Sequence, residues 1–261
     1  MMQQKNMSFV EHFGELRKRL MIIAFFLVAG MGLGFFIAPN VISYLQNIPP
    51  AQDFPMNAFH LTDPLKVYMN FAFFTGVVIT FPVIMYQLWG FISPGLMEKE
   101  RKVTLSYIPV SVVLFLGGLA FSFYILFPYV IEFLGNLADR LNITEQYGIN
   151  EYFAFLFQLT IPFGFLFQLP VVVMFLTRLG IVTPTFLSQI RKYAYFVLLI
   201  IAGFITPPEI VSHLMVTLPM FLLYELSITV SRFAHKRMLK AEAERQRELV
   251  EQEQSNRRDD K

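Results

Sequence analysis

Six apolar stretches, most of them about 20 residues long, constrain this chain more than any other feature of its sequence. A helix rises about 1.5 Å per residue, so crossing the roughly 30 Å hydrocarbon core of a bilayer takes about 20 apolar residues. Hydrophobic residues make up 55% of the 261 positions, and 30 of them are Phe. This is more apolar surface than a soluble core of this size can bury. The sequence therefore predicts an all-α membrane protein with six transmembrane helices.

The six predicted spans are separated by charged or proline-containing segments. They cover residues 20–38, 66–92, 104–133, 152–176, 193–206 and 210–230. The fifth span has only roughly 14 residues before Pro207-Pro208, or about 21 Å of helix, which is shorter than the bilayer core. We therefore expect the membrane to be thinned around the fifth and sixth spans, or their ends to be shielded by protein.

The segments between and after the spans are polar. Residues 39–65 contain several prolines and two aspartates and are predicted to form an irregular loop with one short interfacial helix. Residues 134–151 are predicted to form a second polar loop. The chain is expected to divide into a six-helix transmembrane domain at 1–234 and a polar cytoplasmic tail at 235–261, the tail being a frayed helix followed by disorder.

Lys and Arg are distributed unevenly over the predicted loops. The segments that share a side with the N-terminus carry thirteen of them, at positions 5, 17, 18, 19, 99, 101, 102, 178, 191, 192, 232, 236 and 237. The opposite side carries Arg140, with Lys66 at the end of a span. Under the positive-inside rule this asymmetry predicts that both chain ends lie in the cytoplasm, which agrees with an even number of spans.

Polar and helix-bending residues within the spans indicate a concave bundle. Six prolines lie there, at positions 82, 109, 128, 162, 170 and 219. Each removes a backbone hydrogen bond and kinks its helix, although membrane helices tolerate single prolines. Gln168 lies within the fourth span, where a buried amide needs either an interhelical hydrogen bond or a wet groove, and both interpretations stay open. Glu225, near the cytoplasmic end of the sixth span, is expected to reach the interface or to pair with Arg232.

The sequence gives little support for metal or hydrolytic chemistry. There is no cysteine, and the four histidines are scattered without metal-ligand spacing, so no metal site is expected. Glu209, Ser212 and His213 are the one group that resembles a hydrolytic set. Because Ser212 and His213 are neighbours in sequence, they point in different directions on a helix, and an intramembrane hydrolase is disfavoured.

Two carboxylates stand in otherwise cationic segments on the predicted cytoplasmic face. Glu15 is followed by Arg19 at i,i+4, and Glu100 lies within a charge run, so the simplest interpretation is a local ion pair and a solvated surface. The same carboxylates are also suitable acceptors for a peptide with paired arginines. A guanidinium binds a carboxylate in a bidentate fork that lysine cannot reproduce.

Several separated motifs follow one another along the chain. They are His12-Phe-Gly-Glu-Leu-Arg-Lys-Arg-Leu20, Tyr86-Gln-Leu-Trp-Gly-Phe-Ile-Ser-Pro-Gly-Leu96, Glu100-Arg-Lys102, Phe163-Gly-Phe-Leu-Phe-Gln-Leu-Pro170, Thr206-Pro-Pro-Glu209 and Ser231-Arg-Phe233. In this order they resemble the motifs of the TatC family, the polytopic subunit of the twin-arginine protein translocase. The resemblance extends from about residue 12 to about residue 233. It implies a glove-shaped six-helix protein of the bacterial cell membrane that is not an enzyme and binds no cofactor and no nucleic acid.

The resemblance also implies partners and site residues. The partners are twin-arginine signal peptides of folded precursors, single-span proteins of the TatA/TatB type, and further copies of the chain in a receptor complex that uses the proton-motive force. The signal-peptide surface falls on Glu15, Arg17, Phe91, Leu96 and Glu100. Groove or partner contacts fall on Gln168, Glu209 and Glu225. Many family members carry Glu at the position of Gln168, which puts an obligatory carboxylate there in doubt.

A small-solute or ion transporter is the alternative function. Such a protein is expected to show internal repeats or charged residues deep within several spans. Here no repeat is found in the spans or loops, and the charge is concentrated on the predicted cytoplasmic face. This distribution favours a receptor for a cytoplasmic ligand.

Overall fold

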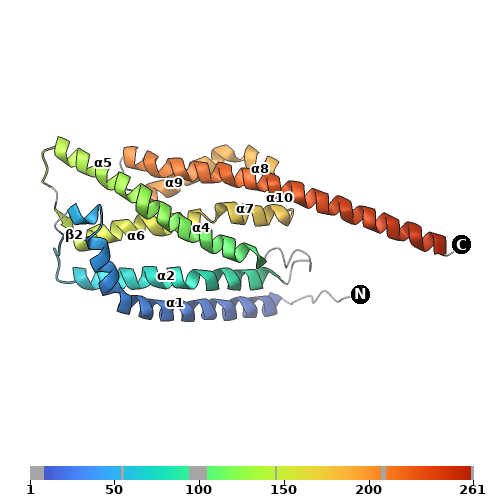
Figure 1. The fold of residues 1–261 in the computed structure, drawn as a ribbon, viewed down its shortest axis with the longest axis horizontal. Coiled ribbons are helices and arrows are strands. Elements are labelled where there is room, and N and C mark those ends of the chain that lie inside the picture. The colour runs from blue at the N-terminus through green and yellow to red at the C-terminus, as the bar shows by residue number, and fades with distance from the viewer. Residues whose placement is uncertain (1–8, 54–55, 94–104, 145, 207–209, 260–261) are drawn as a thin grey trace. The chain divides into compact units, whose positions relative to one another are not determined.

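The computed structural model describes residues 9–53, 56–93, 105–144, 146–206 and 210–259, and these are almost entirely helical (Figure 1). The chain divides into two compact units, Met1–Phe165 and Leu166–Lys261, which are described in turn. The predicted all-α class is confirmed, apart from two very short strands.

The first unit is built from long helices joined by short connections. Its elements are α1 (Phe9–Gln46), the single 3₁₀ turn η1 (Ala51–Asp53), β1 (Met56–Asn57), α2 (Asp63–Ile92), α4 (Tyr107–Phe121), the π-helical turn η3 (Ser122–Leu126), α5 (Phe127–Arg140), β2 (Tyr147–Gly148) and α6 (Ile149–Leu166), which ends at the unit boundary. The strands β1 and β2 pair in parallel, with Met56 opposite Tyr147. This pairing joins the irregular loop predicted at residues 39–65 to the polar loop predicted at residues 134–151.

Helices α1 and α2 lie side by side with their backbones in direct contact (Figure 1). Three glycines make this approach possible. A Cβ at Gly30 would lie 3.1 Å from the Cα of Gly76, and a Cβ at Gly34 would lie 2.8 Å from the Cβ of Thr75. A Cβ at Gly76 would in turn lie 3.0 Å from the backbone nitrogen of Met31. Small residues at such spacing let membrane helices pack closely.

The core of the first unit is aromatic. The rings of Phe81 and Phe115 stack with centroids 3.8 Å apart and planes 6° from parallel. Gly164 of α6 leaves room for Phe115, because a Cβ at position 164 would lie 2.7 Å from that ring. Phe71 packs edge to face against Phe157, with centroids 4.8 Å apart. Burying these large rings stabilises the contacts of α2 with α4 and α6.

The second unit contains α7 (Leu169–Arg178), the short α8 (Pro184–Gln189), α9 (Arg191–Ile205) and α10 (Ile210–Asp259). Helix α10 packs against α7, α8 and α9. A buried hydrogen bond of 2.7 Å between the hydroxyls of Thr177 and Ser231 joins α7 to α10. The Tyr224 hydroxyl donates to the Leu187 carbonyl at 2.9 Å and joins α8 to α10.

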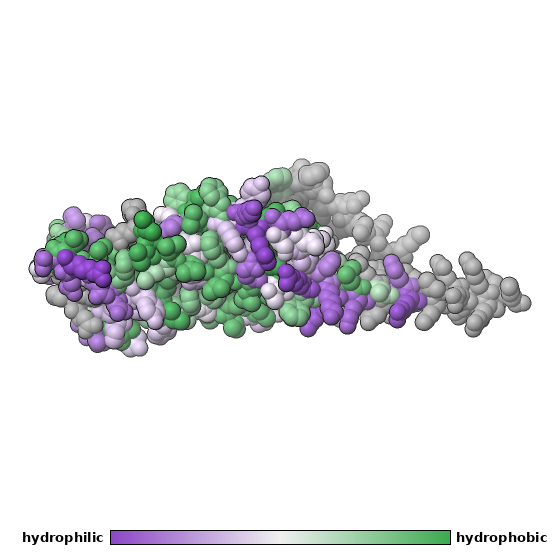
Figure 2. Space-filling view, turned by 90° about the horizontal axis from the view of Figure 1, so that it is seen from above, coloured by the Kyte–Doolittle hydropathy of each residue, from purple (hydrophilic) through white to green (hydrophobic). Residues whose placement is uncertain are grey.

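Five of the described helical stretches are long and apolar enough to cross a membrane. They are Phe13–Gln46, Asp63–Ile92, Tyr107–Arg140, Ile149–Arg178 and Ile210–Lys240. Figure 2 shows apolar side chains over a wide surface of the helices and hydrophilic ones gathered in separate patches. The predicted fifth span corresponds to α9, whose 15 residues amount to about 22 Å of helix.

The structure changes several predicted boundaries. Helix α1 includes the charged residues before the first span and continues through Pro39 to Gln46. Helix α5 extends to Arg140, into the predicted second loop, and ends before Asn142, whose φ is +53°. The fourth span is interrupted by a turn at residues 167–168, with Pro170 in the first turn of α7. Helix α10 continues through Pro219 and is helical to Asp259.

Candidate functional site

Glu15, in the first half of α1, is held against α2 through Arg19. The Arg19 guanidinium donates to Glu15 Oε1 from Nε at 3.1 Å and from Nη2 at 2.5 Å. Its Nη1 donates to Gln87 of α2, at 3.1 Å to Oε1 and 3.3 Å to the main-chain carbonyl. Both ion-pair partners are only 22% exposed. The predicted i,i+4 pair is therefore confirmed, and it also ties α1 to α2.

Gly90 of α2 provides the space in which the Arg19 guanidinium lies. A Cβ at position 90 would collide with Arg19 Nη1 and would lie 2.8 Å from Cζ. Neither Gln87 nor Gly90 was predicted as a site residue, because nothing in the sequence indicates which residue of α2 faces position 19. Both belong to the motif at 86–96, and that membership is the one signal that could have found them.

The Glu15 carboxylate uses one oxygen for Arg19 and leaves the other unused within the described part of the chain. Glu15 Oε1 accepts both bonds from Arg19, whereas Oε2 is buried and accepts no hydrogen bond from any residue that the structure describes. A carboxylate has roughly four lone-pair positions, so this group keeps the capacity to accept a second cation.

The other predicted residues of this surface are placed only in part. Arg17 is exposed on α1, and Phe91 is half-buried on α2, one residue after Gly90. Leu96 and Glu100 lie outside the described residues, as does Glu209. The structure thus brings Glu15 together with the α2 segment that carries Phe91.

Glu225 of α10 forms an ion pair with Arg191 of α9. One interpretation of the sequence had expected a pair with Arg232, and that interpretation is wrong. Arg191 Nη2 donates to Glu225 Oε2 at 2.9 Å, and Arg191 Nε lies 2.9 Å from Oε1. The Tyr195 hydroxyl donates to Oε1 at 2.6 Å. The Tyr195 ring also stacks on Phe221 with centroids 4.4 Å apart. This cluster fixes the start of α9 to the first half of α10.

Gln168 lies in the turn that separates α6 from α7 and is 8% exposed. Its main-chain carbonyl accepts hydrogen bonds from the backbone nitrogens of Val171 at 3.0 Å and Val172 at 2.9 Å, which begin α7. The residue was expected in the middle of a continuous span. The turn arises because Pro170 has no N–H to donate and its ring clashes with a continuous helix in this segment.

Ser212 and His213 do not form a hydrogen-bonded pair in the described structure. The Ser212 hydroxyl is buried, and His213 Nδ1 lies 3.4 Å from the Thr206 hydroxyl. The side chain of His213 is therefore directed toward the end of α9. This geometry does not place the imidazole where it would take a proton from Ser212.

A third carboxylate, Asp63, was not predicted as a site and is fully buried at the start of α2. Its Oδ2 accepts the backbone N–H groups of Phe59 at 3.1 Å and His60 at 2.8 Å, and its Oδ1 lies 3.4 Å from Lys66 Nζ. Ligand atoms of His60, Asp63 and Glu151 lie within 4.8 Å of one another. The backbone amides of Phe59 and His60 and the ammonium of Lys66 already use both Asp63 oxygens. Asp63 therefore fixes the loop before α2 to the start of that helix.

Comparisons with known proteins agree on one family. The family model described as Sec-independent protein translocase protein (TatC) matches residues 11–219. A TatC protein of Halalkalibacterium halodurans is 61% identical over 252 residues, covering 97% of this chain and 100% of that protein. The TatCy protein of Bacillus subtilis is 60% identical over 242 residues, covering 93% and 95% respectively.

A solved structure supports the same relationship. The crystal structure of a twin-arginine translocase receptor, TatC, superposes on this fold with a TM-score of 0.78 at 30% sequence identity. The superposition covers 86% of this chain and 99% of that one.

Proposed function

Because the chain belongs to the TatC family of Sec-independent protein translocase proteins, we propose that it recognises twin-arginine signal peptides through the carboxylate of Glu15. The protein is a core subunit of the twin-arginine translocase and a multi-pass protein of the bacterial membrane. We further propose which residues bind the peptide, how the helices are oriented in the membrane, and which partners assemble with the protein.

The observation that carries this proposal is the geometry around Glu15. The carboxylate is fixed in direction by Arg19 and Gln87, and its Oε2 is not used by any described residue. This oxygen is buried, so a ligand guanidinium must displace the side chains around it, and it then gains a charge-assisted hydrogen bond while the Arg19 pair is kept. A group that is already oriented loses little conformational entropy on binding, which favours affinity.

The remaining members of the surface are proposed from the family motifs. Glu100 supplies a second carboxylate, so that two adjacent arginines of a signal peptide each find an acceptor. Phe91 and Leu96 offer apolar contact to the residues that follow the arginine pair. Arg17, exposed on α1, is proposed to belong to the same signal-peptide surface.

We also propose the orientation and the full set of spans. Six helices cross the membrane, with α9 as the short fifth one, and form a concave, glove-like bundle. The concentration of Lys and Arg in alternate segments supports a cytoplasmic location for both chain ends. In this arrangement residues 1–234 form the membrane domain, and residues 235–261 form a cytoplasmic tail.

The proposed partners are single-span proteins of the TatA/TatB type and further copies of this chain. Gln168, Glu209 and Glu225 are the residues proposed to contribute to the concave face or to partner contacts. Gln168 lies beside apolar helices and Glu225 lies within one, and polar groups in such places support specific helix–helix association. The names of the relatives support a place in a membrane translocase.

Site-specific photo-crosslinking tests the proposal. Probes at positions 96 and 100 are expected to crosslink to a twin-arginine precursor and to lose the crosslink when both arginines are replaced by lysine. A probe on α10 at Leu222, which is exposed on another element, serves as the control position. Equal crosslinking of the twin-arginine and twin-lysine precursors would show that the carboxylates do not recognise guanidinium.

A further inference from the structure

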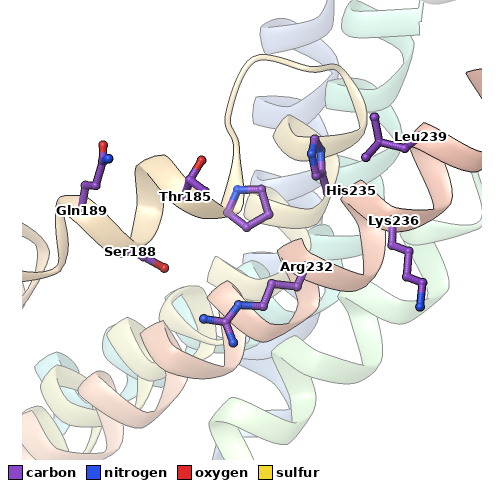
Figure 3. A pocket seen from close by; sticks show the side chains of 8 residues that line it. Thr185, Ser188, Gln189, Arg232, His235, Lys236 and Leu239 are labelled. Atoms are coloured by element: carbon purple, nitrogen blue, oxygen red, sulfur yellow. The ribbon is translucent and has the colours of Figure 1, made fainter.

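A pocket of about 560 Å³ lies between α8 and the stretch of α10 that follows its apolar segment (Figure 3). Helix α8 supplies one wall and α10 the other, and both belong to the second unit. The lining residues are Pro184, Thr185, Ser188, Gln189, Arg232, His235, Lys236 and Leu239. This volume falls within the range typical of small-molecule sites.

The lining carries positive charge and hydrogen-bond donors but no acid. Arg232 and Lys236, one turn apart on α10, make no ion pair with any residue that the structure describes. Within the same part of the chain, His235 Nδ1 is buried and has no hydrogen-bond partner. The Ser188 hydroxyl and the Gln189 amide, on the facing wall, are also donors. A set of unused donors around two cations suits an anion with several oxygen atoms, such as a phosphate group.

The pocket is preformed by contacts outside its lining. Tyr224 holds α8 on α10 through the Leu187 carbonyl at 2.9 Å. The Thr183 hydroxyl accepts the backbone N–H of Phe186 at 3.2 Å and so caps the start of α8. The donors are therefore held in place before any ligand arrives, which lowers the entropic cost of binding.

The surroundings of the pocket indicate which phosphate-bearing molecule it takes. Helix α10 exposes Leu218, Leu222 and Leu226 before Arg232, and its residues become mainly polar after Lys240. The pocket therefore lies where the apolar span meets the polar interface. Phe186 on α8 and Phe233 on α10, the latter 67% exposed, offer apolar surface on the two helices that form it.

We infer that this pocket binds the headgroup of an anionic phospholipid, with Arg232 and Lys236 on the phosphate and the acyl chains along the exposed aromatic residues. Clusters of Lys and Arg beside a membrane helix attract anionic lipids, each cation near the surface contributing severalfold to binding. Which leaflet supplies the lipid rests on the proposed orientation, which places the pocket on the cytoplasmic side. The lipid site itself does not depend on signal-peptide recognition.

Native mass spectrometry of the full-length protein, titrated with phosphatidylglycerol and with phosphatidylcholine of the same chains, tests this inference. The wild type is expected to retain phosphatidylglycerol at least tenfold more tightly than phosphatidylcholine. The double variant Arg232→Gln/Lys236→Gln is expected to lose about tenfold in phosphatidylglycerol affinity. Arg237→Gln/Lys240→Gln removes the same charge from α10 outside the pocket lining and is expected to change the affinity less than twofold.

One further variant distinguishes binding in the pocket from attraction to the positive charge of α10 alone. Ser188→Phe keeps both cations and fills the space between α8 and α10, so it is expected to lower phosphatidylglycerol binding as well. Equal losses in the two double variants, or equal binding of the two lipids, would overturn the inference. Displacement of bound lipid by 10 mM inorganic phosphate, compared with chloride at the same ionic strength, would assign the pocket to free phosphate and overturn the lipid assignment. Precursor crosslinking in the same variants is expected to be unchanged.

Discussion

Arg19 of α1 and Gly90 of α2 occupy complementary positions, because the arginine guanidinium lies where any larger residue at position 90 would place its Cβ. The consequence is a chain of contacts from Gly90 to Arg19 to Glu15. A residue without a side chain thereby helps to set the direction of a carboxylate on another helix.

Gly90→Ala is expected to weaken precursor binding without changing any charge. The added methyl group displaces Arg19 and loosens its hydrogen bonds to Gln87 and Glu15, at a cost of roughly 1 to 2 kcal/mol, or about five- to thirtyfold in affinity. The measurement is precursor affinity with the purified protein. Gly32→Ala on α1 is the control, because no atom lies within 4 Å of the added Cβ. If both variants bind like the wild type, Arg19 does not orient Glu15 for binding.

Glu100→Gln is expected to weaken precursor binding more than Glu100→Asp. Loss of the charge turns a charge-assisted hydrogen bond into a neutral one, which is about half as strong. Binding is to be measured at low and at moderate salt, since screening reduces the contribution of the charge. Equal affinity of wild type and Glu100→Gln at both salt concentrations would rule out the electrostatic account.

Gln168→Glu is expected to support export, whereas Gln168→Leu is expected to impair partner assembly or signal insertion. Gln168 is buried in the turn between α6 and α7, and leucine there removes the polar group that is proposed to support helix–helix association. Export of a folded precursor and co-purification of partners are the measurements. Normal export by Gln168→Leu would reduce the residue to a packing role.

Glu225 and Arg191 are expected to be coupled energetically. A double-mutant cycle with Glu225→Gln and Arg191→Gln should give a coupling of about 1 kcal/mol in unfolding free energy, the scale of polar contacts between membrane helices. The same cycle with Arg232→Gln in place of Arg191→Gln should be additive, because Arg232 makes no ion pair with Glu225. Coupling to Arg232 instead would contradict the observed pairing.

Lengthening α9 is expected to block export while leaving precursor binding intact. About six leucines inserted between Val197 and Ala202 relieve a mismatch of several Å between the helix and the bilayer. They also rotate the residues that follow, so an insertion of seven, close to two full turns, separates length from rotation. Normal export by both variants, once each is shown to insert stably, would exclude a role for membrane thinning.

The existence and order of the helices were predictable because apolar run length decides them in a lipid solvent. The Glu15–Arg19 pair was predictable for the same local reason, since i,i+4 neighbours meet on any helix. The partners of Glu225 and the role of Gly90 were not predictable from the sequence, because they depend on which faces of two separate helices meet. No periodicity within one segment carries that information.

Boundaries were the weakest part of the sequence-based prediction. The break at Gln168 was missed because its flanking residues are apolar on both sides, although Pro170 was in view. The buried Asp63 was treated as one acid of a polar loop, yet the dipeptide Asp63-Pro64 is a typical helix start.

The glycine contact between α1 and α2 has a mechanical consequence. Where Gly30 meets Gly76, the two backbones touch without side chains between them. The two helices are therefore expected to move together as one rigid pair. If Glu15 binds the signal peptide as proposed, a force on Glu15 is carried by both helices together. The load reaches the far end of α2, where Asp63 anchors the loop by its own hydrogen bonds. Force applied near Glu15 is then expected to reach the loop that Asp63 holds at the opposite end of α2.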